Sequence, residues 1–243
     1  MTYCLAMNLE AGLVFASDSR TNAGVDNIAR FEKMRVFARD GDRVVVTLSA
    51  GNLSVTQNAL SLLELRARND PAALSLWNAK SLFEVASLLG DALREVRARD
   101  ETYLREKNID ASASFILGGQ IGSEIPRLFL VYSEGNFIES SNDTPYVQIG
   151  EIKYGKPILD RIITRHSPLS DAVKCALVSF DSTMRSNISV GAPIDMLIYD
   201  VNSLRIGLKR RLDEDDPYLV AIRSGWEGGL QHAFDQLPVN GWR

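Results

Sequence analysis

The spacing of apolar residues along the chain alternates between the two-residue period of strands and the 3.6-residue period of helices. Short apolar runs at residues 3–7, 12–16, 34–38 and 43–49 are rich in β-branched or aromatic residues, and they predict four strands. Residues 8–11 form the first predicted turn. Asp40-Gly41-Asp42 predicts a hairpin connection because glycine tolerates a positive φ. Residues 18–26 are polar and predict a loop.

Two helices are predicted after this first group of strands. Leu53, Leu60 and Leu63 lie opposite a polar face and indicate a helix that reaches about residue 68. In the second helix, Ser81 is the expected N-cap. Apolar residues recur there at three- and four-residue steps: Leu82, Val85, Ala86, Leu89, Leu93 and Val96. The charge-rich continuation at residues 97–107 predicts a solvated face rather than a binding patch.

The second half of the chain repeats this order. Strands are predicted at residues 112–117, 127–132 and 146–149, and helices at 153–163 and from 167 or 168 onward. Strands at 194–199 and 203–208 follow, then a charged turn at 209–216 and a glycine-interrupted tail. This order excludes strict βαβ alternation and favours antiparallel sheets covered by helix pairs. We therefore expect an α+β fold, a four-layer αββα sandwich, formed by residues 1–243 as one domain, since no linker or repeat is visible.

Charge and composition narrow the range of functions. The 243 residues are 45% hydrophobic and carry a net charge of −4, which does not favour nucleic acid as a partner. Cys4 and Cys175 lie in apolar patterns, and His166 and His232 are far apart in sequence. None of the four has the spacing of a metal site. We expect neither a metal nor an organic cofactor.

The opening residues do not resemble a targeting segment. Asn8 and Glu10 interrupt the first apolar run, so a signal peptide is not expected. No stretch approaches the ~18 apolar residues that a membrane span requires. These features predict a cytoplasmic protein without a membrane partner.

Position 2 is the most informative candidate for chemistry. Methionine is removed readily before a residue as small as threonine, which would leave Thr2 with a free amine and a hydroxyl on the same residue. That pair can act as general base and nucleophile, because an α-amine has a pKa of roughly 7.7–8.0. The alternative is an ordinary start codon followed by a small residue.

Three further residues fit a nucleophilic Thr2. A lysine such as Lys33 would lower the pKa values of the amine and the hydroxyl, and the Asp18 carboxylate would hold that lysine charged. Gly51, where a strand meets a helix, would offer a backbone N–H to a developing oxyanion and let the substrate approach closely. Each also has a structural alternative: a turn cap, a solvated surface charge or a tight bend.

These segments resemble the proteasome β-subunit superfamily. The match consists of Thr2-Tyr3-Cys4, the Phe-Ala-Ser-Asp-Ser-Arg run at residues 15–20, Lys33, and Leu-Ser-Ala-Gly at residues 48–51. Residues 13–26 and 149–157 are similar to the bacterial proteasome-homologous group called Anbu, the ancestral β-subunit. The resemblance covers essentially the whole chain, and it implies the N-terminal nucleophile hydrolase fold.

The resemblance also implies roles for individual residues. Thr2, Lys33, Asp18 and Gly51 would be the nucleophile, its tuning cation, the partner of that cation and the oxyanion donor. The substrate would be held by the backbone of Thr21 and Asn22, as an added strand, and by Ser49 and Leu53 beside the pocket for the residue before the cut. Arg20 would brace the loop beneath the site.

The chain departs from the β-subunit pattern around the far side of the nucleophile. The nearest matches there are Gly150-Glu151 and the run from Ser186 to Gly191, which contains Asn187 and Ser189. A glutamate and an asparagine then replace serine and aspartate. The extra carboxylate would tend to keep the Thr2 amine protonated.

The sequence thus predicts a threonine peptidase that acts on peptides or unfolded proteins and forms a homo-oligomer, either a ring or a helical assembly. Two other functions stay open: an amidohydrolase acting on a small amide or conjugate, and a non-catalytic scaffold or binding subunit. Whether an energy-dependent unfoldase is a partner is also left open.

Overall fold

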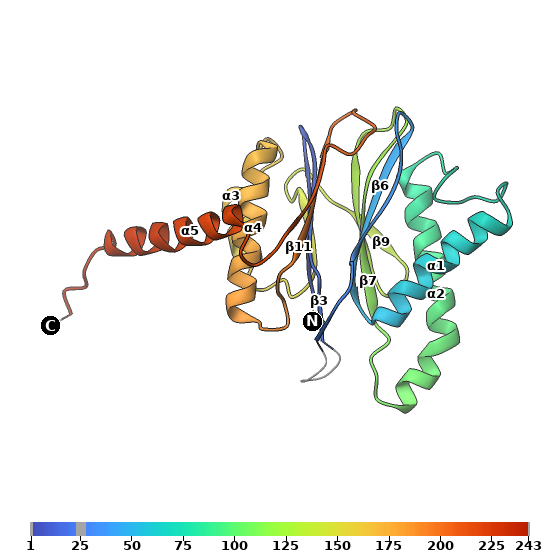
Figure 1. Ribbon diagram of the computed structural model, residues 1–243, viewed down its shortest axis with the longest axis horizontal. Helices are drawn as coiled ribbons and strands as arrows, with labels where there is room; N and C mark the ends of the chain where they lie inside the picture. Colours follow the sequence, from blue (N-terminus) through green and yellow to red (C-terminus); the bar gives the residue numbers. More distant parts are fainter. Residues whose placement is uncertain (1, 23–27, 243) are drawn as a thin grey trace.

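Two antiparallel five-stranded sheets lie face to face in the computed structural model, which describes residues 2–22 and 28–242 (Figure 1). The first sheet has the order β10 (Tyr146–Gly150), β1 (Tyr3–Leu9), β2 (Gly12–Asp18), β11 (Ile194–Asp200) and β12 (Leu208–Leu212). The second has the order β5 (Met34–Arg39), β6 (Arg43–Gly51), β7 (Ala113–Ile121), β8 (Arg127–Val131) and β9 (Phe137–Glu139). β3 (Arg20–Asn22) and β4 (Ile28–Arg30) form a separate pair.

Helix pairs cover the outer faces of both sheets. α3 (Lys156–Ile162) and α4 (Leu169–Ser186) lie on the first sheet, and α1 (Leu53–Asn69) and α2 (Leu82–Glu106) lie on the second (Figure 1). The predicted α+β sandwich of four layers, αββα, is therefore confirmed. Asn52 and Ser81 accept backbone hydrogen bonds as the N-caps of α1 and α2, which fixes where these helices begin.

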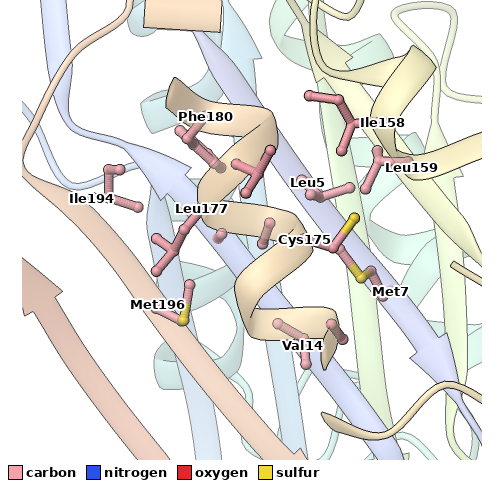
Figure 2. Close-up of a cluster of buried hydrophobic side chains, with 14 of the residues drawn as sticks. Leu5, Met7, Val14, Ile158, Leu159, Cys175, Leu177, Phe180, Ile194 and Met196 are labelled. Carbon is pink, nitrogen blue, oxygen red and sulfur yellow. The ribbon is translucent and has the colours of Figure 1, made fainter. Parts of the chain in front are cut away.

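Strand β1 shows how the core is divided. Its odd-numbered residues, such as Leu5 and Met7, pack against α4, where Figure 2 shows them around Cys175. Its even-numbered residues Cys4 and Ala6 belong to the cluster between the two sheets. All seven residues of the strand are buried. This alternation is the two-residue period of a strand with both faces covered.

The C-terminal part of the chain differs from the prediction. The strand expected at residues 203–208 is wrong, because Asn202 and Leu204 adopt positive φ angles in a turn and β12 begins only at Leu208. The basic residues expected in a turn at 209–211 lie in this edge strand, where charges are tolerated and limit edge-to-edge pairing. The glycine-interrupted tail forms α5 (Pro217–Asp235), which Asp216 caps. α3 is also shorter than the predicted 153–163.

The short strands β3, β4 and β9 were not predicted. Residues 23–27, in the loop expected at 18–26, lie outside the described residues. Within the described part of the chain, no helix is long and apolar enough to cross a membrane.

Candidate active site

A buried ion pair lies where β2 ends. The Lys33 ammonium donates to Oδ1 of Asp18 at 2.6 Å and to the carbonyl oxygen of Arg20 at 2.6 Å. The same Oδ1 accepts the backbone N–H of Tyr3 at 3.0 Å. Asp18 is fully buried and Lys33 is 4% exposed. The structure thus joins the two predicted charged residues directly to the first strand.

Opposing effects act on the Asp18 carboxyl. Burial raises its pKa, while the Lys33 ammonium and the amides of Tyr3 and Gly191 favour the ionised form and lower it. The charged state of the carboxylate therefore depends on Lys33. A lysine held this way, with two oxygen acceptors, is fixed in position and orientation.

Thr2 directly precedes β1 and is partly buried. Its carbonyl oxygen accepts the backbone N–H of Glu151 at 2.7 Å, which extends the pairing of β1 with β10. Continuing the alternation of β1, Thr2 belongs to the same face as Cys4, toward the second sheet. The amide that contacts Asp18 belongs to the peptide bond between Thr2 and Tyr3. Met1 lies outside the described residues.

The end of β6 approaches the same place. The Ser49 amide donates to the Lys33 carbonyl at 3.1 Å, and the Cys4 thiol contacts the Ser49 carbonyl at 3.6 Å. Burial raises the pKa of this thiol, so Cys4 is a neutral wall of the site. The segments that carry Thr2, Asp18, Lys33 and Ser49 are therefore in direct contact.

Gly51, two residues beyond Ser49, occupies a position that other residues cannot take without strain. Its φ is +97°, and a Cβ added there would lie 2.3 Å from the Ser112 carbonyl oxygen. The next amide, that of Asn52, donates to the same oxygen at 2.8 Å. The backbone is thus held close to the loop before β7, with the glycine at the junction of β6 and α1.

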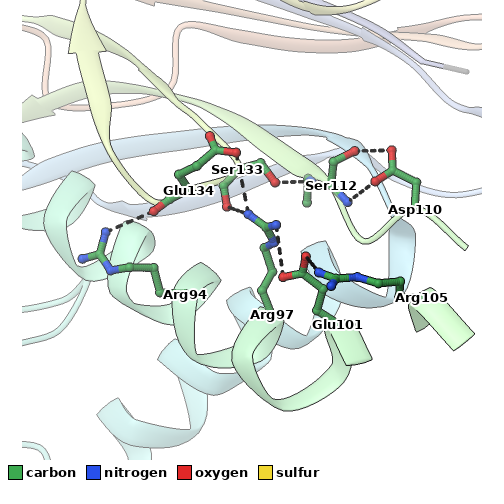
Figure 3. Close-up of polar contacts among 9 residues, drawn as sticks. Arg94, Arg97, Glu101, Arg105, Asp110, Ser112, Ser133 and Glu134 are labelled. Carbon is green, nitrogen blue, oxygen red and sulfur yellow. Dashed lines mark hydrogen bonds and ion pairs between the residues drawn. The ribbon is translucent and has the colours of Figure 1, made fainter. Parts of the chain in front are cut away.

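A polar network fixes that loop (Figure 3). Asp110 accepts hydrogen bonds from both the amide and the hydroxyl of Ser112. The Arg97 guanidinium donates to the Ser133 carbonyl at 2.6 Å, and the Ser133 hydroxyl accepts the amide of Ala113. The prediction that residues 97–107 form only a solvated face is therefore wrong for Arg97, which joins α2 to the turn after β8.

The two predicted pocket residues line one cavity. Ser49 and Leu53 border a pocket of about 190 Å³. The remaining lining residues come from β5 and the segment before it and from α1: Glu32, Arg35, Thr56, Gln57, Leu60 and Ser61. The walls are mixed, with polar groups beside the apolar Leu53 and Leu60. Sequence reasoning missed Glu32 and Arg35, because only the fold brings them next to α1.

Thr21 and Asn22, whose backbone is predicted to bind an extended peptide, lie in β3. It pairs with β4 through Thr21 opposite Ala29 and Asn22 opposite Ile28. Within the described residues its other edge carries no strand, so its backbone can accept one more.

The four residues predicted to support the site form two groups. Nη1 of Arg20 donates to the Ile188 carbonyl at 2.9 Å, and its guanidinium lies against Gly191, so it braces the 187–191 turn. The side-chain amide of Asn187 donates through Nδ2 to Oε2 of Glu151 at 3.0 Å.

Ser189 enters the same arrangement through its backbone N–H, which donates to Oδ1 of Asn187 at 2.9 Å. Glu151 is 8% exposed. This buried carboxylate lies on the residue whose amide contacts Thr2.

Sequence reasoning missed the anchor of Tyr3. Its hydroxyl bonds to the Ser179 hydroxyl at 2.6 Å and accepts from the Gln148 side chain. A Cβ on Gly155 would lie 2.4 Å from that hydroxyl, so the close approach of the 155 backbone requires glycine. The one available signal was Ser179, a polar residue on the apolar face of α4. The described residues contain no group of three or more His, Cys, Asp or Glu that could hold a metal ion.

Comparison with known proteins places these features in a family. No family model and no curated protein sequence matches the chain. Among solved structures, Anbu (ancestral beta-subunit) from Yersinia bercovieri is 51% identical, with a TM-score of 0.91, over 98% of this chain and 99% of that one. The chain belongs to the Anbu family. The resemblance stated from sequence is confirmed.

Two further Anbu structures are similar over the same extent. Anbu from Hyphomicrobium sp. strain MC1 is 45% identical, with a TM-score of 0.90, over 98% of this chain and 99% of that one. Anbu from Pseudomonas aeruginosa, described as a helical assembly of the Anbu complex, is 49% identical, with a TM-score of 0.93, over 99% and 98%. The shared Anbu fold therefore extends over nearly the full length of the chain.

Proposed function

We propose that this chain is an N-terminal-threonine hydrolase that cleaves peptide bonds through an acyl-enzyme ester on Thr2. The observation that carries the proposal is the buried Lys33 ammonium, held by Asp18 and Arg20, with Asp18 also accepting the amide of Tyr3, the residue that follows Thr2. Burying a lysine beside a carboxylate has a desolvation cost, and buried charged groups of this kind are concentrated at functional sites. Such a lysine lowers the pKa values of a neighbouring amine and hydroxyl.

The reaction follows from these positions. After Met1 is removed, the neutral Thr2 amine accepts the hydroxyl proton while the hydroxyl oxygen attacks the substrate carbonyl. The Gly51 N–H stabilises the oxyanion. Collapse expels the amine half of the peptide, which receives the proton, and leaves an ester on Thr2. Water activated by the same amine then hydrolyses the ester.

The substrate class follows from β3 and the neighbouring pocket. A peptide added to the edge of β3 through the backbone of Thr21 and Asn22 presents its side chains to alternate faces. The side chain before the cut enters the pocket beside Ser49 and Leu53. At about 190 Å³ this pocket holds a side chain rather than a large ligand.

We further propose that the chain acts in the cytoplasm as a homo-oligomer. The support for assembly is the P. aeruginosa relative, whose structure is a helical assembly. That assembly is a property of the relative, and the 49% identity between the two chains supports extending it to this chain as a proposal.

Hydrolysis of a peptide library tests the function, with small amides as the comparison. Thr2→Ala is expected to abolish turnover, and Thr2→Ser, which keeps the amine and a hydroxyl, to retain it. Cleavage of small amides but not peptides would favour the amidohydrolase alternative. Full activity in Thr2→Ala or Lys33→Ala would contradict the proposal. A wild-type chain that cleaves neither peptides nor small amides would favour the non-catalytic scaffold.

A further inference from the structure

The pocket beside Ser49 and Leu53 is one end of a longer groove between β5 and α1. It continues into a second pocket of about 550 Å³, and the two pockets share the lining residues Glu32 and Arg35. One stripe of α1 lines the whole groove at three- and four-residue steps. Its members, in order from the first pocket to the second, are Leu53, Thr56, Gln57, Leu60, Ser61, Glu64, Ala67 and Arg68. Arg35 therefore lies where the first pocket opens into the second.

The strand pairing places Arg35 close to Ser49. In β5, Phe37 packs against the helices while Met34 packs between the two sheets, so the alternation of the strand turns Arg35 toward α1. Arg35 is opposite Thr47 of β6, and Ser49 is two residues further along that strand. Arg35 and Ser49 are thus diagonal neighbours on one face, a relation in which residues are roughly 7–8 Å apart.

The Arg35 guanidinium has a weakly held partner and free donors. Its Nη2 lies 3.6 Å from Oε1 of Glu64, and it makes no hydrogen bond within residues 2–22 and 28–242. The two side chains are 49% and 36% exposed. A solvated ion pair of this kind contributes little to stability. A carboxylate on a ligand can therefore replace Glu64 at small cost.

The other charged residue of the first pocket, Glu32, is already neutralised. Its Oε1 accepts a hydrogen bond from the Lys209 ammonium at 2.9 Å. A charge-assisted bond of this length offsets the carboxylate charge, so Glu32 is a poor anchor for a cationic ligand. The remaining polar residues of the first pocket are uncharged: Ser49, Thr56, Gln57 and Ser61. The charge that a ligand meets there is that of Arg35.

The groove as a whole differs in sign from the rest of the chain. Its lining contains three cations and two carboxylates: Arg35, Arg68, Lys209, Glu32 and Glu64. The complete chain carries a net charge of −4. A local excess of positive charge attracts anionic ligands and is screened by salt.

We propose that Arg35 determines specificity and that the site prefers peptides with an acidic side chain, above all glutamate, before the cut bond. Once that side chain enters beside Ser49 and Leu53, its carboxylate accepts two N–H bonds from the guanidinium and takes the place of Glu64. Glutamate is favoured over aspartate because the side chain has to span the pocket to reach Arg35. This inference rests on the proposed function, since it names the peptides that the site takes.

The test uses peptides that differ only in the residue before the cut, which is glutamate, glutamine, leucine or lysine. Glutamate and glutamine have nearly the same shape, so their ratio of kcat/KM reports on charge. Arg35→Gln removes the guanidinium and Arg35→Glu reverses the charge. Arg39→Gln is the matched control, because Arg39 is an exposed arginine of the same strand that pairs with Asp42 and lines neither pocket. Circular dichroism and urea unfolding check the fold of each variant.

We expect the wild type and Arg39→Gln to cleave the glutamate peptide at least about fivefold more efficiently than the glutamine peptide. The ratio should fall to near one in Arg35→Gln, and Arg35→Glu should prefer lysine to glutamate. A ratio near one in the wild type would overturn the proposal. So would a ratio that Arg35→Gln leaves unchanged, or one that Arg39→Gln lowers equally.

Binding to the Thr2→Ala chain separates this inference from catalysis. Fluorescein-labelled, C-terminally amidated forms of the same peptides bind there without being cut, and fluorescence anisotropy gives their Kd values. A fivefold preference for glutamate that Thr2→Ala/Arg35→Gln loses would uphold the role of Arg35 even if the wild type cleaved no peptide, and the proposed function alone would then fail. Equal binding of the glutamate and glutamine peptides, or binding of neither, would overturn the role of Arg35. Peptide cleavage by the wild type would in that case leave the proposed function standing.

Discussion

Replacing Lys33 with methionine removes the ammonium that contacts the Asp18 carboxylate at 2.6 Å and keeps an unbranched side chain of similar length. Asp18 is fully buried and would keep the Tyr3 amide at 3.0 Å. Breaking a buried pair by removing one partner costs about 3–5 kcal/mol, because the other charge stays desolvated. The free energy of unfolding of a whole domain is about 5–15 kcal/mol, so Lys33→Met should remove a large part of it.

The loss should depend on pH in a definite direction. Burial already raises the Asp18 pKa, and without Lys33 the main opposing effect is lost, so it rises further. The unfolded value is about 3.9. Because the folded pKa is the higher one, the stability contributed by Asp18 is complete below about pH 4 and is lost as pH rises through the folded pKa. The deficit of Lys33→Met relative to the wild type should therefore be larger at pH 7 than at pH 5.

Urea unfolding at fixed protein concentration, followed by tryptophan fluorescence, measures this effect at both pH values. The double variant Lys33→Met/Asp18→Asn removes both charges and is expected to recover more than half of the stability lost by Lys33→Met alone. Equal unfolding midpoints for the wild type and Lys33→Met at pH 7 would refute the reasoning, as would a deficit that does not change between pH 7 and pH 5.

Three further substitutions probe the surroundings of Thr2. Glu151→Gln removes a buried negative charge near the amine and should shift the acidic midpoint of the pH–rate profile to lower pH; an unchanged midpoint would contradict its electrostatic role. Gly51→Ala places a Cβ 2.3 Å from the Ser112 oxygen at φ +97°. We expect the free energy of unfolding in urea to fall by at least about 1 kcal/mol and inhibitor labelling to slow. If neither change occurred, the close packing at Gly51 would be contradicted. Tyr3→Phe leaves the Ser179 and Gln148 partners unsatisfied and should cost about 1–3 kcal/mol in thermal unfolding, whereas an unchanged midpoint would argue against the anchor.

The layered fold could be predicted because the apolar period changes clearly along the chain. Residues 43–49 form a short apolar run rich in β-branched residues, residues 82–96 follow a helix period, and the Asn52 and Ser81 caps have local causes that lie in the sequence. β12 could not be predicted this way. Its residues Lys209, Arg210 and Arg211 have no apolar alternation, and the strand forms because β11 offers an edge and Asp195 pairs with Arg211.

The candidate site was predicted in part for a similar reason. The pairing of Asp18 with Lys33 follows from a motif whose members lie near strand ends. The anchor of Tyr3 depends on Ser179, which is 176 positions away, and no local pattern reports a contact over that separation. The helical character of α5 was hidden by Gly225, Gly228 and Gly229, which have a low helix propensity. Packing of Leu219, Ile222 and Trp226 on the core favours the helix, and the local sequence does not report that packing. Two statements stay predictions: one domain spans residues 1–243, and the named residues perform catalysis.

The central claim is that Thr2 carries both a free amine and the attacking hydroxyl. Intact-mass spectrometry of the purified protein, before and after treatment with an epoxyketone or β-lactone inhibitor, tests it most directly. We predict a mass without Met1 and an inhibitor adduct on Thr2 that a Thr2→Ala variant does not form. Retained Met1, or an adduct that forms equally on Thr2→Ala, would contradict it.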